Sequence, residues 1–356
     1  MRKTFLKSAI LSLIILLSVS CSSVYDKVYP TLTDGKYDSE FPYNNSSTQL
    51  EEISRSIKLL NSIAFYTGYV FKTGSNYTLS DMKKIDFEKS AIEKVFFNRT
   101  SSGTATLIYT DAEKIALISV AHIVNYPDTI ISYFVNADGT FSNYVQSISI
   151  KSNQSNYVPD LPRDGKLDIL MLDNSLDIAL LGMKLNPAES LPLTKFEYPW
   201  GKSSELEWGS FVYVFGFPMN YKMISKGIVS KIPKDNSGFL IDAVFNRGYS
   251  GGIVLAIRDG VPNFELVGLV RSVPAEFEYT LRPLTKEHDI DYNPMIPYSG
   301  EIYVDKHQAL RIGITKVIGI EQIKSFFEKN KDQLLKKGYF FKDFYPSSTI
   351  KIETKR

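Results

Sequence analysis

Residues 115–122 read Ile-Ala-Leu-Ile-Ser-Val-Ala-His, and this stretch decides the fold. The run from residue 115 to residue 120 is almost entirely apolar and short, which is typical of a buried β-strand. Ala121 and His122 follow it directly. A small residue before the histidine lets the backbone turn while the imidazole faces a cleft. The stretch therefore predicts a buried strand that ends at a candidate functional histidine.

Similar short runs of β-branched and aromatic residues recur from about residue 65 to residue 314. Turn-forming residues separate them. A parallel sheet would require helices that alternate with these runs, and the sequence predicts none between them. The pattern therefore predicts a mainly β fold, a barrel or a sandwich. The expected strands include residues 104–109, 130–135, 211–215, 252–257 and 266–270.

A helix is expected at each end of this β region. Thr48 and Glu51 have the spacing of a capping box, and the apolar residues after them fall three or four apart. This predicts an N-terminal helix over residues 47–64. A second helix is expected near residues 320–335, in a C-terminal segment, residues 319–356, that ends in a basic tail.

The N-terminus has the features of a secretion signal. Arg2, Lys3 and Lys7 make a basic start, and an apolar run and small residues lead to Cys21. The apolar run is too short to span a bilayer as a helix. Residues 1–20 are therefore expected to be a signal peptide.

Cys21 lies where the signal of a bacterial lipoprotein is cut and lipidated. The residues before it resemble a lipobox, although Ser18 replaces the usual leucine. The alternative is an ordinary secretory signal with an incidental cysteine. Ser22 and Ser23 supply no acidic residue that would resemble an inner-membrane retention signal, so we expect a periplasmic or surface-exposed protein, anchored preferentially at the outer membrane. Residues 21–46 are polar and are expected to be a tether.

Composition limits the class of protein. The net charge of +2 becomes −1 when the three signal-peptide cations are removed, so the charge does not indicate a nucleic-acid partner. A single cysteine excludes an intramolecular disulfide. The mature chain, about 335 residues long, is long enough to be stabilised by its core alone, because chains of about 300 residues bury roughly three quarters of their unfolded surface.

Three residues occur in settings that suit nucleophilic catalysis: His122, Asp177 and Ser250. A serine hydroxyl is a poor nucleophile unless an imidazole accepts its proton and a carboxylate orients that imidazole. Asp177 begins an apolar run, and a carboxylate there needs a partner because burying it unpaired is costly. We predict that His122 Nδ1–H is this partner.

Glycines surround the candidate nucleophile, because residues 248–252 read Gly-Tyr-Ser-Gly-Gly. Glycine permits backbone angles that other residues rarely adopt. The amides of Gly248 and Ser250 are therefore expected to point together as an oxyanion hole.

In this order and context, the three segments resemble the chymotrypsin-like (trypsin-like) serine proteases, and within them the bacterial Deg-type branch. The resemblance extends over about residues 85–325. It implies a protease domain over residues 65–318 with two antiparallel β-barrels, about 65–190 and 191–318, and a catalytic cleft between them. Supporting motifs are residues 102–107, 214–218, 226–230 and 266–270.

Several positions depart from the family pattern. Tyr249 replaces the acidic residue of the digestive enzymes, which makes trypsin-like zymogen activation unexpected. The resemblance implies that Val244 is the floor of the specificity pocket and that Val273 lies near its wall, so we expect cleavage after small or medium apolar residues. If Asp242 formed the floor instead, basic residues would be preferred. Arg271 stands where smaller residues are common and is expected to narrow the pocket.

The predicted function is a serine endopeptidase that acts on protein or peptide substrates and is held at the membrane by its N-terminal lipid. No cofactor or metal is predicted. Residues 289–293 begin like a calcium-binding loop, but the sixth position of that loop is proline in place of glycine and the twelfth is glycine in place of glutamate. We expect no peptide-binding PDZ domain after position 330. Two alternatives stay open: a catalytically inactive binding lipoprotein, and an esterase that uses the same three residues.

Overall fold

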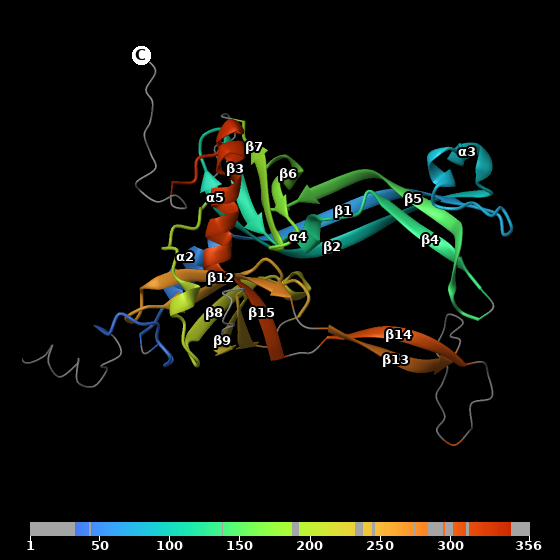
Figure 1. Cartoon of the computed structure of the whole chain (residues 1–356). Coiled ribbons are helices and arrows are strands. Elements are labelled where there is room, and N and C mark those ends of the chain that lie inside the picture. Colours follow the sequence, from blue (N-terminus) through green and yellow to red (C-terminus); the bar gives the residue numbers. More distant parts are fainter. Residues whose placement is uncertain are drawn as a thin grey trace, which may run out of the picture.

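The fold consists of two antiparallel β-barrels with a helix near each end of the chain, which confirms the predicted fold class (Figure 1). Each barrel closes with six strands. The computed structural model describes residues 33–42, 44–136, 138–186, 192–231, 238–243, 246–272, 275–283, 295, 302–310 and 313–342.

The first barrel closes because β1 pairs on one side with β2 and on the other with β5. The run from residue 115 forms β3 and pairs with β7, and the side chains from Ile115 to Ser119 and from Ile178 to Met183 are buried. Both faces of these two strands are therefore covered by other parts of the protein. The strands in barrel order are β1 (Ile57–Val70), β2 (Glu93–Thr110), β3 (Lys114–Ser119), β7 (Ile178–Lys184), β6 (Lys166–Asp173) and β5 (Phe141–Tyr157).

The N-terminal helix is shorter than the sequence predicts. The helix α2 spans Ser47–Ser56, and Ile57 begins strand β1. Leu60 and Ala64 were expected on a helical stripe, but they are buried on alternating positions of a strand. The three- and four-residue spacing was ambiguous there, and pairing with two neighbouring strands satisfies the backbone more completely than an isolated helix would.

Residues 151–166 are polar and contain Pro159 and Pro162, a composition that predicts a surface loop, but only part of this segment is a loop. Strand β5 continues to Tyr157, and only the segment after it, with the short helix η3 (Arg163–Gly165), connects to β6. A polar residue of this strand, Asn156, has its partner on the neighbouring strand β1. Ser62 Oγ donates to Asn156 Oδ1 at 2.6 Å, and both residues are buried. Polarity therefore does not prevent this segment from being a strand.

The second barrel closes through pairing of β10 with both β9 and β15. Its neighbours are linked in the order β10-β15-β12-β11-β8-β9. The strands are β8 (Phe211–Gly216), β9 (Met223–Lys231), β10 (Phe239–Ala243), β11 (Ile253–Ile257), β12 (Phe264–Ser272) and β15 (Gly313–Gly319).

Two strand arms extend from the barrels toward the same side (Figure 1). The first arm is formed by the ends of β1, β2 and β5 together with β4 (Thr129–Val135), and the short helices η2 (Asp81–Lys83) and α3 (Phe87–Ser90) lie between β1 and β2. The second arm is a hairpin of β13 (Ala275–Pro283) and β14 (Ile302–Leu310).

The C-terminal helix α5 (Ile320–Lys336) lies against both barrels, contacting β12 and β15 of the second and β6 of the first (Figure 1). This location confirms the predicted helix. Beyond it, Tyr339 and Phe341 are buried against Tyr109 of β2. The helix therefore joins the two barrels on the side away from the arms. Its buried residues are Ile320, Ile323, Phe326, Phe327 and Leu334, and their spacing of one to seven positions places them on one side of the helix.

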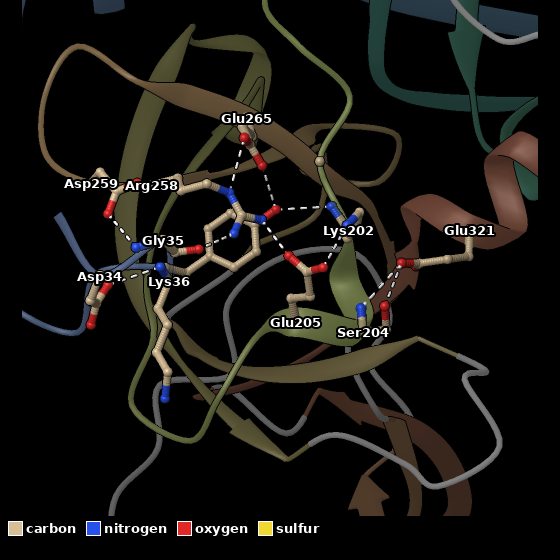
Figure 2. Close-up of polar contacts among 12 residues, drawn as sticks. Asp34, Gly35, Lys36, Lys202, Ser204, Glu205, Arg258, Asp259, Glu265 and Glu321 are labelled. Atoms are coloured by element: carbon tan, nitrogen blue, oxygen red, sulfur yellow. Dashed lines mark hydrogen bonds and ion pairs between the residues drawn. The ribbon is translucent and has the colours of Figure 1, made fainter. Parts of the chain in front are cut away.

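Part of the expected tether is docked on the second barrel (Figure 2). The Gly35 N–H donates to Asp259 Oδ1 at 2.7 Å. Arg258 stacks 4.0 Å over the ring of Tyr37, and the Tyr37 hydroxyl donates to Glu265 at 2.6 Å. The chain is thus fixed well before the first helix begins. Cys21 and the signal segment lie outside the described residues, and no helix within the described ranges is long and apolar enough to cross a bilayer.

Candidate active site

His122 and Asp177 are brought together by the pairing of β3 with β7. The two strands run antiparallel with Ser119 opposite Ala179, so the end of β3 lies beside the start of β7. His122 follows β3 in the one-turn helix α4 (Ala121–Val124), and Asp177 directly precedes β7. Two segments 55 residues apart in the sequence therefore present an imidazole and a carboxylate to each other.

The carboxylate is held on both of its oxygens. Asp177 Oδ2 lies 2.9 Å from His122 Nδ1, and Oδ1 accepts the His122 backbone N–H at 2.9 Å. The Ala121 N–H donates to the Asp177 carbonyl at 3.1 Å. Asp177 has a φ of 60°, a left-handed conformation that aspartate tolerates better than most residues. The Asp177 side chain is 11 % exposed and that of His122 43 % exposed, so the carboxylate is inside while the imidazole faces the solvent side.

Arg271 also contacts this carboxylate. It lies near the end of β12, and its Nε is 3.4 Å from Asp177 Oδ2. Sequence reasoning placed Arg271 near the specificity pocket and missed this ion pair, because nothing local in the sequence links β12 to the turn before β7.

The loop that carries Ser250 is fixed by one buried threonine of the first barrel. The Thr104 backbone N–H donates to the Ser250 carbonyl at 2.8 Å. The Thr104 hydroxyl donates to the Gly248 carbonyl at 2.7 Å and accepts the Phe217 N–H at 3.0 Å. Thr104 belongs to the predicted opening strand, but its linking role was not predicted. The contact between the two barrels therefore positions the candidate nucleophile.

Gly248 is required at its position, because it has a φ of 111° and a Cβ there would lie 2.1 Å from the Phe217 carbonyl oxygen. Among the described residues, the N–H groups of Gly248 and Ser250 donate to no other group. The two amides predicted to form an oxyanion hole are therefore not used in holding the loop.

Tyr249 is an uncharged anchor of the same loop. Its side chain is buried, and its hydroxyl lies 2.6 Å from the Ser225 hydroxyl of β9. Burial raises the pKa of Tyr249, so the phenol stays neutral. Gly216 provides the space, since a Cβ there would lie 2.3 Å from Tyr249 Cδ1. A part-buried pair of hydroxyl groups thus holds this loop against β9.

His122, Gly248 and Ser250 line one cavity of about 630 Å³. Polar side chains dominate its walls, and the cations are His122, when protonated, and Arg247. Its other lining residues are Asn61, Ser62, Ile63, Thr100, Ser101, Ser102, Tyr157, Asn246, Arg247, Tyr249 and Val270.

The residues expected to form the specificity pocket are only partly described. Val244 and Val273 lie outside the described residues. Asp242 is exposed on β10 and does not line the cavity, which weakens the alternative of an acidic pocket floor.

Ser250 and His122 share the cavity without a hydrogen bond between their side chains in the part of the chain that the structure describes. Catalytic hydrogen bonds of this kind are often long in a free enzyme and tighten when substrate binds. Nε2 is the ring nitrogen of His122 that is left for proton transfer in this cavity, because Nδ1 of the same ring is already held by Asp177.

Two closed six-stranded barrels, with an imidazole and a carboxylate from the first and a serine loop from the second, define the chymotrypsin-fold class of serine proteases. Residues 103–269 match the family described as Trypsin-like peptidase domain, and the matched segment contains His122, Asp177 and Ser250. This protein therefore carries a trypsin-like peptidase domain.

The chain is similar to solved structures of proteases and of an inactivated protease paralogue. A thermostable serine protease from an extremophilic microorganism is 9% identical, with a TM-score of 0.36 over 79% of this chain and 99% of that chain. Kallikrein-related peptidase 10 is 11% identical, with a TM-score of 0.32 over 75% and 95%. An inactivated protease paralogue of the scabies mite is 11% identical, with a TM-score of 0.30 over 78% and 93%. No curated protein matches the chain.

Proposed function

We propose that the protein is a serine endopeptidase in which Ser250 attacks the peptide carbonyl, His122 accepts and returns the proton, and Asp177 orients the imidazole. The observation that carries this proposal is the buried Asp177 carboxylate paired at 2.9 Å with His122 Nδ1 beside a cavity that also contains Ser250. The match to a peptidase family supports peptide bonds as the substrate.

The chemistry follows from these positions. A proton on Nδ1 that is directed to Asp177 leaves Nε2 as the basic nitrogen, which is the nitrogen that must face the serine. The negative oxygen that forms on the attacked carbonyl is then stabilised by the unused N–H groups of Gly248 and Ser250. The mechanism needs no bound cofactor.

The proposal is tested by peptide hydrolysis with purified variants. Ser250→Ala and His122→Ala are each expected to lower turnover by at least about 10⁴-fold, and the double variant to lose little more, because the residues act as a unit. Asp177→Asn is expected to be severe, on the order of 10⁴-fold in turnover. Hydrolysis at the wild-type rate by Ser250→Ala would remove the proposed mechanism.

One observation favours a second candidate, a non-catalytic binding protein on a protease scaffold. The side chains of Ser250 and His122 share no hydrogen bond in the described structure. If this separation persisted in the presence of peptide, the cavity would bind peptides without cleaving them. Binding of peptides by wild-type protein, with no cleavage and no effect of Ser250→Ala on affinity, would favour this alternative.

We further propose that cleavage follows small or medium apolar residues, with Val244 as the pocket floor and Val273 near its wall. The exposed position of Asp242 on β10 supports an apolar floor. Sequencing the products of a peptide-library digest tests this, and a majority of cuts after Lys or Arg would contradict it.

We also propose that Cys21 carries a lipid that holds the domain at the bacterial envelope, with the outer membrane favoured. The basic start, the apolar run and the single cysteine support this anchor. Cys21→Ala is expected to release the protein from membranes or to block its maturation. Unchanged membrane partition together with an unchanged mature mass would exclude lipidation at this residue.

A further inference from the structure

The Asp177 carboxylate has a second cationic neighbour besides the imidazole. Nε of Arg271 lies 3.4 Å from Asp177 Oδ2, the same oxygen that lies 2.9 Å from His122 Nδ1. The Arg271 side chain is 44 % exposed and the Asp177 side chain 11 % exposed. A guanidinium that is partly in solvent therefore reaches a carboxylate that is inside the protein.

A permanent charge at this place changes what the carboxylate does for the imidazole. A guanidinium stays protonated over the whole working range of pH. Its positive charge offsets part of the negative charge of Asp177 and repels a proton on His122. A neutral hydrogen-bond donor in the same place would orient the carboxylate without offsetting its negative charge.

We propose that Arg271 is a positioning residue that shares the Asp177 carboxylate with His122 and thereby weakens the hold of that carboxylate on the protonated imidazole. The role given to His122 rests on the proposed function, whereas the ion pair itself is part of the structure. Maximal turnover is thereby restrained, because the imidazolium that forms during attack is stabilised less.

Other titratable groups lie near His122 and Asp177. Tyr157, Arg247 and Tyr249 line the same cavity as His122. In the turn before Asp177, Asp173 is 3.1 Å from Lys329 of α5 and accepts from Ser175, and these contacts hold the pKa of Asp173 at about 2. Among the cations in the described ranges, the ones paired with Asp177 are His122 and Arg271. Arg247 therefore provides a matched control, a cavity cation not paired with Asp177.

The test is an NMR titration of the histidine rings in the purified protein carrying Ser250→Ala, which prevents self-cleavage. The chain has three histidines, so His122→Ala assigns the relevant signal. Arg271→Gln is expected to raise the pH midpoint of the His122 signal by roughly half to one pH unit, since it removes a positive charge. Arg271→Lys is expected to keep most of the wild-type midpoint, and Arg247→Gln to move it much less than Arg271→Gln does.

The outcomes separate this inference from the proposed function. An unchanged His122 midpoint in Arg271→Gln, or equal shifts for Arg271→Gln and Arg271→Lys, would overturn the role of Arg271 even if the protein is an active peptidase. A shift found only in Arg271→Gln supports it even if Ser250 proves unreactive. In an active protein, the acid limb of the kcat/KM profile is expected to move to higher pH in Arg271→Gln in the same way.

Discussion

At the residue scale, the hydroxyl of Thr104 links the first barrel to the loop that carries Ser250. Thr104 is fully buried on β2, and its hydroxyl donates to the Gly248 carbonyl and accepts the Phe217 N–H. Both partners belong to segments that surround Ser250. The position of the nucleophile loop therefore depends on a residue that touches none of the reacting atoms.

Removing this hydroxyl is expected to damage the site more than the fold. Thr104→Val keeps the shape of the side chain but removes the hydroxyl that the Phe217 N–H and the Gly248 carbonyl both contact. This loss is expected to lower the free energy of unfolding by about 1–3 kcal/mol. We expect the rate of hydrolysis to fall at least ten-fold while the barrels stay folded. Thr104→Ser, which retains the hydroxyl, is the control and should keep most activity. Equal activity in Val and Ser variants would show that the hydroxyl does not position the loop.

At the element scale, helix α5 braces the barrels. Its buried face contacts β12, β15 and β6, and Phe327 packs edge-on to both Trp200 and Phe326. Glu321 in its first turn accepts the Ser204 N–H at 3.1 Å and contacts the Ser203 hydroxyl, which ties the helix to the connection between the barrels. The helix is therefore part of the domain and not a terminal appendage.

Truncating a side chain on this face is expected to lower global stability. Phe326→Ala removes a fully buried ring and should reduce the free energy of unfolding by about 3–5 kcal/mol. Leu335→Ala on the same helix is a control, because that side chain is 40% exposed, and it should cost much less. Chemical denaturation of the two variants measures both values. Similar losses for both would mean that α5 does not contribute to the core.

Strands that are buried along their whole length could be predicted from the sequence. Contacts between segments that are distant in the sequence could not. Residues 115–119 and the buried face of α5 were predicted because their apolar periodicity is unambiguous. Residues 57–64 were assigned to a helix because their spacing fits both periods, and only pairing of β1 with β2 and β5 decides between them. The candidate triad could be predicted from local motifs. The partners Thr104 and Arg271 could not, because their contacts join strands of different barrels or distant turns.

At the scale of the whole molecule, the N-terminal segment is fastened to the second barrel through a buried carboxyl group. The Asp38 backbone N–H donates to Ile257, its carbonyl accepts from Phe211, and its side chain accepts the Gly260 N–H. Burial raises the pKa of Asp38 to about 6, and the nearby charge of Glu40 adds to the effect. The attachment of this segment to the barrel is therefore sensitive to pH.

The sign of this dependence follows from the direction of the shift. The pKa of Asp38 is higher in the folded protein than its ordinary value of 3.8, so the fold favours the protonated form. Stability from this group is fully present below about pH 4 and declines as the pH rises through about 6. The expected loss is on the order of 2 kcal/mol, because the shift of the Asp38 pKa from 3.8 to about 6 corresponds to about 3 kcal/mol and screening by solvent lowers this value. Asp38→Asn should remove that decline, as measured by denaturation at several pH values, and an unchanged decline in Asp38→Asn would assign it to other groups.

The central claim is that Ser250 is a nucleophile activated by His122, and reaction with a fluorophosphonate probe tests it most directly. Mass spectrometry of the labelled protein identifies the modified residue without knowledge of the natural substrate. The account predicts a single adduct on Ser250, absent in Ser250→Ala and at least about 10²-fold slower in His122→Ala, since general-base assistance contributes on the order of 10²–10⁴-fold. A wild-type protein that remains unlabelled, or one labelled equally fast after His122→Ala, would contradict the claim.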